Sequence, residues 1–404
     1  MNNTTMWRTP TLVISAGCLI AMLTFGVRSG FGLFLEPMSS DLGWGREVFA
    51  LAIAIQNLLW GLGQPFAGAL ADRYGAGRVL AGGGILYVLG LVLMAFTSSP
   101  VMLYLSAGVL IGLALSGAAF GIVLAAITRI VSEEKRSWAL GMGTAAGSLG
   151  QFLLTPLGQA FLSAYGWSTA LLLLAGLAAA VIPLASVLAG KPQMTGVGME
   201  QSLRQALKEA GGHASYWYLI AGFFVCGFHV AFIQTHLPAY LSDMGLGGSI
   251  GAWAISLVGL FNVVGAYMSG VMGGKYSKKY LLSFLYFARA VVIALFIMLP
   301  LSPLTVYLFS AAIGLLWLST VPLTSGLVAL MFGPRYMATL FGIVFFSHQI
   351  GAFLGVWLGG LLYDSTGSYQ VVWWMGVALG ILAGLIHWPI REQQVARLEP
   401  APAV

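Results

Sequence analysis

Charged residues are scarce in this chain. Only 7% of its 404 residues are Asp, Glu, Lys or Arg, against 59% that are hydrophobic, whereas soluble domains carry about 25% charged residues. No polar stretch is long enough to fold as a separate domain. The composition argues against a soluble enzyme or a nucleic-acid-binding module, despite a net charge of +6. It predicts an integral membrane protein with several spans.

Cysteine is nearly absent, and no carboxylate lies in the middle of a hydrophobic stretch. Cys18 and Cys226 both fall within predicted spans and are interpreted as free apolar thiols. All twelve acidic residues fall in predicted loops, tails or span ends. We therefore expect no metal site and no cofactor. Without a nucleophile–base pair, we also expect that the protein is not an enzyme.

Hydrophobic stretches long enough to cross a membrane recur along the whole chain. A span needs roughly 20 apolar residues and is helical, because lipid offers the backbone no hydrogen-bond partners. Twelve transmembrane helices are predicted, at about residues 11–36, 47–71, 79–97, 101–130, 138–162, 168–190, 216–242, 249–273, 280–299, 303–331, 337–362 and 371–390. Every Lys and Arg except Arg28, Arg46 and Arg289 falls on one side of these spans. This positive-inside bias predicts that both termini are cytoplasmic.

The two halves of the chain repeat a short motif. Gly68–Leu80 follows the second span, and a related stretch begins at Gly270, after the eighth. We predict an all-α fold of two six-helix bundles related by a pseudo-two-fold axis. The N-terminal bundle covers 1–190, a cytoplasmic linker covers 191–215, and the C-terminal bundle with a short polar tail covers 216–404. Tryptophans near span ends, Trp373 among them, are interpreted as anchors at the membrane interface.

The motif at the second span identifies a family resemblance. Gly68–Leu80 resembles the signature loop of the major facilitator superfamily through Gly68, Asp72, Arg73, Gly75 and Arg78. The resemblance implies a cytoplasmic gate in which the loop is tied to neighbouring helix ends, where charged side chains interact with the helix dipole. The second copy of the motif has Gly274 where the first has Asp72.

Two further stretches resemble the monocarboxylate transporter branch, and the chain is also similar in outline to the oxalate/formate antiporter branch. The two stretches are Glu133–Gln151 and Gly26–Pro37, and the monocarboxylate transporter family carries a functional lysine where Arg28 stands. The Asp–Arg pair of the proton-coupled lactate transporters on span 8 is replaced by Asn262 and Ala266. The basic residues that the antiporters use on spans 8 and 11 are missing. The resemblance therefore implies a substrate class rather than a coupling ion.

Arg28 and Arg289 lie inside hydrophobic stretches with no carboxylate nearby. A charge at membrane depth costs about 3 kcal/mol even on the milder scales and rarely lies there without a role. Arg28 is expected to bind substrate, because a guanidinium matches a carboxylate with two hydrogen bonds. Arg289 either reaches the substrate or bonds within its own bundle. The remaining candidates for the substrate site are His229, His236, Asn262, His348 and Gln349.

These features predict a secondary active transporter that moves a small organic anion, with a monocarboxylate as the leading candidate, by alternating access. Its expected partners are that anion, the lipid bilayer and, where protons drive transport, protons carried either by histidine or by the substrate itself. We expect a monomer in the plasma membrane, or in the inner membrane of a bacterium, and no nucleic-acid partner. The alternative function is an exporter of drugs or amphiphilic metabolites from the same superfamily. An exporter of cations would require an acidic residue in its cavity, and none is found.

Overall fold

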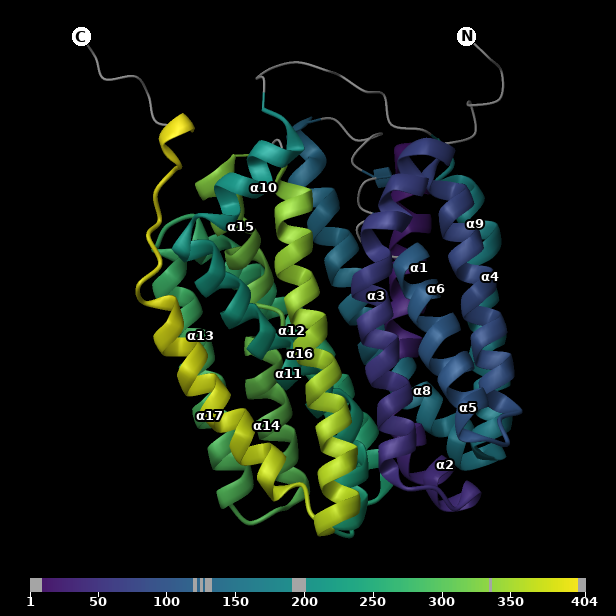
Figure 1. The fold of residues 1–404 in the computed structure, drawn as a ribbon. Coiled ribbons are helices and arrows are strands. Elements are labelled where there is room, and N and C mark those ends of the chain that lie inside the picture. The colour runs from purple at the N-terminus through teal and green to yellow at the C-terminus, as the bar shows by residue number, and fades with distance from the viewer. Residues whose placement is uncertain are drawn as a thin grey trace, which may run out of the picture.

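The computed structural model describes residues 9–118, 122–123, 126–127, 133–190, 201–333 and 336–398, and only the backbone of residues 133–141 and 144. The described chain is helical apart from short connections (Figure 1). The helices of the first half are α1 (Pro10–Ser29), η1 (Phe31–Phe34), α2 (Leu35–Leu42), α3 (Arg46–Tyr74), α4 (Ala76–Ala95), α5 (Pro100–Leu103), η2 (Tyr104–Leu110), α6 (Ile111–Gly117), α8 (Glu133–Ala179) and α9 (Val181–Val187). Those that follow are α10 (Leu203–Gly211), α11 (Ala214–Asp243), α12 (Gly248–Gly273), α13 (Lys278–Met298), α14 (Pro303–Leu316), α15 (Thr320–Phe332), α16 (Met337–Thr366), α17 (Gln370–His387) and η3 (Ala396–Leu398).

Eleven helical segments of the described chain are long and apolar enough to cross a membrane. The longest, Ala145–Val187, covers the fifth and sixth predicted spans together. Its 43 residues would form a straight helix of about 65 Å, twice the thickness of the hydrocarbon core. Gly166 interrupts it with a φ of 75°, a conformation that glycine adopts without strain. The segment therefore turns at Gly166 and runs back. The end of the fourth predicted span lies largely outside the described residues, so the count of twelve stays a prediction.

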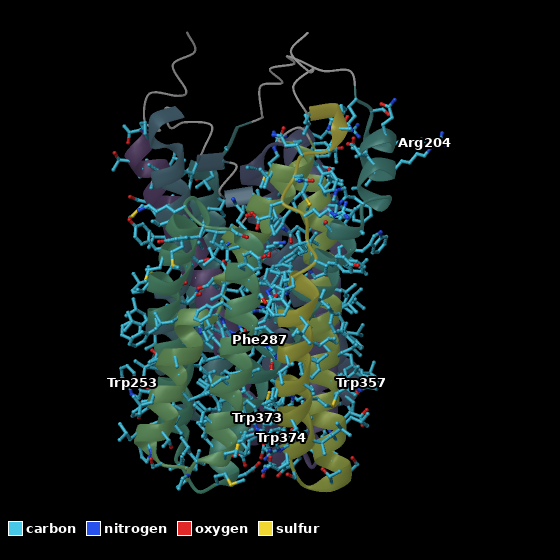
Figure 2. All side chains as sticks on the ribbon, turned by 90° about the vertical axis from the view of Figure 1, so that its left-hand side faces the viewer. Arg204, Trp253, Phe287, Trp357, Trp373 and Trp374 are labelled. Atoms are coloured by element: carbon cyan, nitrogen blue, oxygen red, sulfur yellow. The ribbon has the colours of Figure 1, made fainter. Side chains whose placement is uncertain are left out.

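Two groups of helices lie side by side. Figure 1 shows α1–α9, in purple through blue to teal, beside α11–α17, in teal through green to yellow, and the helices of each group pack mainly on one another. We call the end that carries Pro10 and Leu398 the terminal face, and the opposite end, which carries Gly43 and Gly166, the distal face. The linker helix α10 lies at the terminal face, and Figure 2 shows Arg204 pointing away from the bundle there. The domain boundaries and the cytoplasmic position of the termini stay predictions.

The prediction that Trp373 lies at the membrane interface is wrong. Its side chain is only 1% exposed. The ring packs edge-on against Phe232 at 4.8 Å and Phe296 at 5.5 Å between centroids. The neighbouring Trp374 is 47% exposed, and Figure 2 shows the two side chains close together near the distal face. Consecutive residues on a helix point in different directions, so position along the span does not decide which of them faces lipid.

Glycines on α16 allow it to pack closely against α11. A Cβ added at Gly351 would clash with the carbonyl oxygen of Phe224, and one added at Gly355 would lie 2.6 Å from that of Phe228. Small residues four apart permit such close approach in membrane helices. Between the two groups, α3 contacts α16 and α8 contacts α12. These two helix pairs, together with smaller contacts of α11 with η1 and α2, form the interface between the groups.

Replacing Gly351 with alanine should lower the stability of the purified protein, because the new methyl group has to displace a backbone carbonyl. Overpacking of this kind costs about 1–3 kcal/mol. Gly342→Ala on the same helix is the matched control, since a Cβ there would meet open space. The measurement is the apparent melting temperature of both variants in one detergent. An unchanged melting temperature for Gly351→Ala would contradict the packing described.

Candidate functional site

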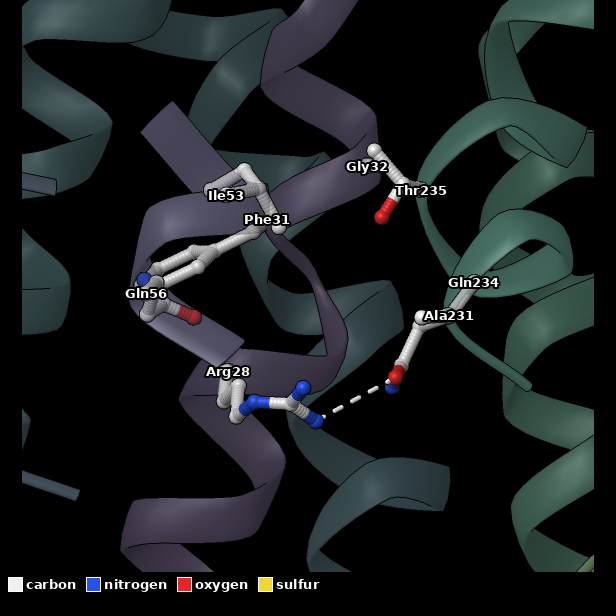
Figure 3. Close-up of a pocket in the computed structure, with 8 residues that line it drawn as sticks. All are labelled: Arg28, Phe31, Gly32, Ile53, Gln56, Ala231, Gln234 and Thr235. Carbon is white, nitrogen blue, oxygen red and sulfur yellow. Dashed lines mark hydrogen bonds between the residues drawn. The ribbon is translucent and has the colours of Figure 1, made fainter. Parts of the chain in front are cut away.

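Arg28 bridges the two helix groups near the middle of the molecule. It lies in the last turn of α1. Its Nη2 donates to Oδ1 of Asn57 on α3 at 2.6 Å, and its Nη1 donates to Oε1 of Gln234 on α11 at 3.3 Å. The guanidinium carbon lies 4.7 Å from the ring centroid of Trp60, a cation–π contact. Figure 3 shows the side chain reaching across to Gln234 in the other group.

The charge of Arg28 has no acidic partner among the described residues, because both of its hydrogen-bond acceptors are neutral amides. Its Nε is buried and makes no hydrogen bond within the described chain. Nearby, Oε1 of Gln56 and Nε1 of Trp60 are buried and likewise lack a partner there. The same holds for both amide atoms of Gln349, which packs against Gly61. Unpaired buried polar groups and a buried cation are costly, and an anion with hydrogen-bonding oxygens would satisfy the donors among them.

A small cavity lies beside Arg28. It is lined by Arg28, Phe31, Gly32, Ile53, Gln56, Ala231, Gln234 and Thr235 (Figure 3). Its volume is about 10 Å³, room for about one water molecule. A Cβ added at Gly32 would lie 2.7 Å from the carbonyl oxygen of Thr235, so the two groups touch through their backbones. A molecule larger than water can enter only when the groups separate here.

At the distal face, Arg46 forms an ion pair between the groups. It begins α3, and its two Nη atoms donate to the two carboxylate oxygens of Asp243 at 2.6 and 2.7 Å. Its guanidinium carbon lies 3.9 Å from the ring centroid of Tyr363, and Nη1 also donates to the Tyr369 hydroxyl at 2.9 Å. All three partners belong to the second group. Bidentate pairing of this kind is stronger and more directional than a single contact.

Asp364 supplies the N-terminal cap of α3 from the other helix group. Its Oδ1 accepts from the backbone N–H of Arg46 at 2.9 Å, and its Oδ2 accepts from that of Glu47 at 2.8 Å. A helix N-terminus has unpaired N–H groups and favours negative charge. Gly45, at the N-cap position, has no side chain to fill this role. Trp357 adds a hydrogen bond of 3.1 Å from Nε1 to Oε1 of Glu47.

The histidines predicted for the substrate site on α11 do not line the cavity at Arg28. His236 is buried, with Nε2 2.8 Å from the Val356 carbonyl oxygen and Nδ1 3.2 Å from the Tyr369 hydroxyl. Burial raises the pKa of the Tyr369 hydroxyl, which therefore stays protonated and can donate to His236. His229 is buried deeper in the second group, with Nε2 2.7 Å from the Gly376 carbonyl oxygen. His236 is therefore connected, through Tyr369, to the contacts of Arg46 at the distal face.

Asn262 and His348 lie closer than His229 to the surface where the two helix groups contact each other. Asn262 donates from Nδ2 to Oγ of Ser148 on α8 at 2.9 Å, and its Oδ1 accepts from the backbone N–H of Leu318 at 2.9 Å. The His348 ring is stacked on Phe345 with 5.7 Å between centroids. Phe345 in turn packs edge-on against Trp60 at 5.5 Å. An aromatic series therefore connects His348 to the ring over which Arg28 lies.

Arg289 does not face this cavity. It is 1% exposed, and its Nε and Nη2 donate to the Leu316 carbonyl oxygen at 3.1 and 2.6 Å. Its Nη2 also donates to the Trp317 carbonyl oxygen. These carbonyls end α14, and a cation at a helix C-terminus is favourable. Of the two roles expected for Arg289, the contacts seen here correspond to bonding within its own group.

The residues of the signature loop lie at the terminal face. Gly75 has a φ of 95° and ends α3, with its N–H donating to the Ala71 carbonyl oxygen at 2.9 Å. The side chains of Asp72, Arg73 and Arg78 are exposed, and Gly68 borders open space. No ion pair between described residues includes them. Their gating role stays a prediction. No group of metal-binding side chains is found in the part of the chain that the structure describes.

Several residues of the site were not singled out in the sequence. Gln56 and Asn57 on α3 and Gln234 on α11 are the amides around Arg28, and Trp60 lies beneath it. An amide side chain inside an apolar span is as unusual as the histidines that the sequence predicted for the substrate site. The two adjacent amides of α3 are therefore the sequence feature that could have indicated the partners of Arg28.

Two groups of membrane-spanning helices packed side by side are an architecture found in secondary transporters. A family model for the Major Facilitator Superfamily matches residues 17–356. The chain belongs to this superfamily, as its signature loop predicted, and is a multi-pass membrane protein.

Relatives and solved structures of similar fold are transporters as well. The chain is 28% identical to monocarboxylate transporter 13 of Rattus norvegicus, over 93% of this chain and 89% of that one. It is 25% identical to the MFS-type transporter YcxA of Bacillus subtilis, over 92% of each. A bacterial homologue of the human lysosomal transporter Spinster has a TM-score of 0.74 at 16% identity and covers 97% of this chain and 99% of that one. The nucleoside transporter NupG has a TM-score of 0.78 at 13% identity, over 94% and 99%. At these identities, the solved structures show a shared fold only.

Removing the cap at the distal face should favour a state in which that face opens. Asp364→Ala should cost the closed state about 1 kcal/mol, roughly a fivefold change in population. The measurement is the distance between spin labels on Tyr165→Cys and Met244→Cys, which are exposed positions near the distal face in the two groups. The labelled protein carries serine at both native cysteines.

Asp41→Ala is the matched control for this experiment. Asp41 lies at the same face and accepts a hydrogen bond from Trp167 of its own group at 2.7 Å. It should therefore leave the label distances unchanged. Identical distance distributions for Asp364→Ala and the unsubstituted protein would show that the cap does not hold the groups together.

Proposed function

We propose that this protein moves a small organic anion, a monocarboxylate, across the membrane by alternating access. The observation that carries the proposal is Arg28. It is a cation that bridges the two groups through neutral amides only. The proposal agrees with the presence of monocarboxylate transporters among its relatives. It also agrees with the absence of any acidic contact to Arg28 in the described chain, because a cavity built for cations would need one.

The two amides occupy Arg28 when no substrate is bound. Asn57 comes from the same helix group, and its Nδ2 donates to the Ile53 carbonyl oxygen at 2.8 Å, which turns Oδ1 toward the guanidinium. Gln234 comes from the other group. A carboxylate that arrives with two oxygens can replace both acceptors, and its charge makes the hydrogen bonds stronger. Loss of the Arg28–Gln234 bond also removes a link between the groups, so substrate binding and separation of the groups are coupled.

The reverse exchange supports the return of the empty carrier. When the anion leaves, the guanidinium regains Asn57 and Gln234 and is not left unpaired in a closed cavity. Leaving it unpaired would cost several kcal/mol by the usual estimate for buried charges. The neutral amides are strong enough to satisfy Arg28 and weak enough to be displaced.

Arg28→Ala should weaken carboxylate binding by about tenfold to a hundredfold, since a hydrogen bond to a charged group contributes about 1.5–3 kcal/mol. Arg28→Lys should restore part of it, because the charge remains while the bidentate geometry is lost. Arg204→Ala, on the surface of α10, is the control for a lost positive charge. Uptake of a labelled monocarboxylate into proteoliposomes measures the effect. Unimpaired uptake by Arg28→Ala would remove the basis of the proposal.

The charge of the substrate separates this proposal from a cation exporter. Small carboxylates should raise the melting temperature of the protein, because a ligand that binds the folded state stabilises it. The corresponding neutral amides should not, since Arg28 discriminates by charge in a low-dielectric cavity. A cationic dye should neither bind nor be transported. Export of the dye, together with no effect of carboxylates at high concentration, would favour the exporter instead.

A further inference from the structure

A carboxylate bound at Arg28 would leave part of the nearby polar surface without a partner. When ionised it only accepts hydrogen bonds, so it can replace the amide oxygens of Asn57 and Gln234 at the guanidinium. It cannot pair with a further acceptor. Two buried acceptors without a partner among the described residues nevertheless remain, Oε1 of Gln56 and Oε1 of Gln349. A substrate that satisfies either of them has to bring a donor of its own.

Gln349, on α16, has neither of its polar atoms paired. The residue is 0% exposed, and its Oε1 and Nε2 both lack a hydrogen-bond partner in the described chain. A primary amide can donate two hydrogen bonds and accept two, so all of this capacity is unused. Leaving such a group unpaired away from water is costly, and unpaired buried side chains are the exception in native proteins. An amide in this condition points to a ligand that pairs with it.

Gln349 faces the first helix group, one turn from the amide that binds the guanidinium. A Cβ added at Gly61 on α3 would lie 2.8 Å from Cγ of Gln349, so this side chain packs directly against α3. Gly61 is four residues from Asn57, which accepts a hydrogen bond from Arg28, and residues four apart share a face of a helix. One turn of helix is about 5.4 Å long. A molecule held at Arg28 can therefore extend to Gln349.

Trp60 supplies an unpaired donor at the same level. Its Nε1–H is buried and has no acceptor among the residues that the structure describes. Its ring centroid lies 4.7 Å from the guanidinium carbon of Arg28. The ring also packs edge-on against Phe345 at 5.5 Å between centroids, and Phe345 lies four residues before Gln349 on the same face of α16. The indole of Trp60 thus lies between the cation and the helix that carries Gln349.

A hydroxyl group matches these unpaired atoms. It can donate its hydrogen to Oε1 of Gln349 and accept from Nε1–H of Trp60, because an O–H group is both donor and acceptor. A ketone or a second carboxylate only accepts, and it leaves Oε1 of Gln349 unpaired. An ammonium group can donate, but it places a second positive charge near Arg28 in a low-dielectric interior. An alkyl group pairs with neither atom.

We propose that the substrate is a monocarboxylate with a hydroxyl group several bonds from its carboxylate, and that Gln349 and Trp60 bind this hydroxyl. The inference rests on the proposed function, since it takes the carboxylate to lie at Arg28. The separation follows from the helical turn between Asn57 and Gly61, because about 5 Å corresponds to an extended chain of about four bonds. A hydroxyl on the carbon next to the carboxylate stays too close to Arg28 to reach Gln349.

Reclosure of the two groups around the substrate sets the preference for a hydroxyl. Trp60 belongs to the first group and Gln349 to the second. A hydroxyl between them satisfies both and links the groups, in place of the Arg28–Gln234 bond that the carboxylate removes. A methyl group at the same position keeps water out and leaves both unpaired. Sites that hydrogen-bond a substrate hydroxyl reject analogues without it for this reason.

Pairs of carboxylates of equal size test the inference. γ-Hydroxybutyrate and valerate differ by a hydroxyl in place of a methyl, and so do lactate and isobutyrate, in which the exchange lies next to the carboxylate. Titration calorimetry on the purified protein measures the dissociation constants. We expect γ-hydroxybutyrate to bind about tenfold to a hundredfold more tightly than valerate, and lactate and isobutyrate to bind about equally. Equal binding of γ-hydroxybutyrate and valerate would overturn the inference and leave the proposed function standing. If no carboxylate binds, the proposed function itself fails.

Substitution of Gln349 tests its role. Gln349→Met keeps the length of the side chain but cannot hydrogen-bond the hydroxyl, so the preference for γ-hydroxybutyrate over valerate should fall to near unity while valerate still binds. Gln151→Met is the matched control. Gln151 is also buried between the groups, but its Nε2 already donates to the Ile255 carbonyl oxygen at 2.9 Å, so the preference should persist. If Gln349→Met does not fold, Trp60→Phe, which removes the N–H, replaces it and should lower the same ratio. An unchanged ratio in the variant used, or an equal loss in Gln151→Met, would overturn the assignment.

Discussion

A guanidinium group is always charged in proteins, so when it is buried among membrane helices the surrounding groups must stabilise its charge by accepting hydrogen bonds. Arg28 and Arg289 do this differently. Arg28 has two neutral amides, one from each helix group, beside a small cavity. Arg289 has the carbonyls of a broken helix within one group. In the proposed function, a ligand replaces the first set of partners while both groups stay folded. The second is part of the fold of its group and cannot be exchanged without undoing the tenth span.

The distal face holds the groups together by contacts that are individually modest. Asp243 is 24% exposed in its ion pair with Arg46, and the cap from Asp364 lies at the surface. Partly exposed pairs and caps are each worth about 1 kcal/mol. Across the described chain, the hydrogen bonds between the groups lie between this face and the level of Asn262. A carrier that opens alternately to two sides requires contacts between its groups that are individually this weak. The free energy of substrate binding has to shift the equilibrium between the closed and the open distal face.

The spans could be predicted because each depends on local hydropathy. Arg28 could be predicted as a site residue because a charge within an apolar span is conspicuous. Its partners could not, since Gln234 lies 206 residues away along the chain. The same holds for Arg46, whose partners Asp243 and Asp364 are 197 and 318 residues away. The break between α14 and α15, just before Thr320, is only weakly indicated by the sequence. Pro322 suits the first turn of α15, where an N–H has no helical partner, but its position does not reveal the side chains that fill the break.

In the protein without ligand, the closed arrangement of the two groups competes with ligand binding, because it leaves no room in the cavity. Under the proposed function, an anion is too large for its 10 Å³ and would bind only to the fraction of molecules whose groups have separated. The apparent dissociation constant is the intrinsic one divided by that fraction. The proposed binding at Arg28 would therefore be sensitive to changes at the distal face that never touch the ligand. Two related carriers with identical residues around the anion can differ in affinity through their closures alone, so specificity and affinity in such a protein are set in different places.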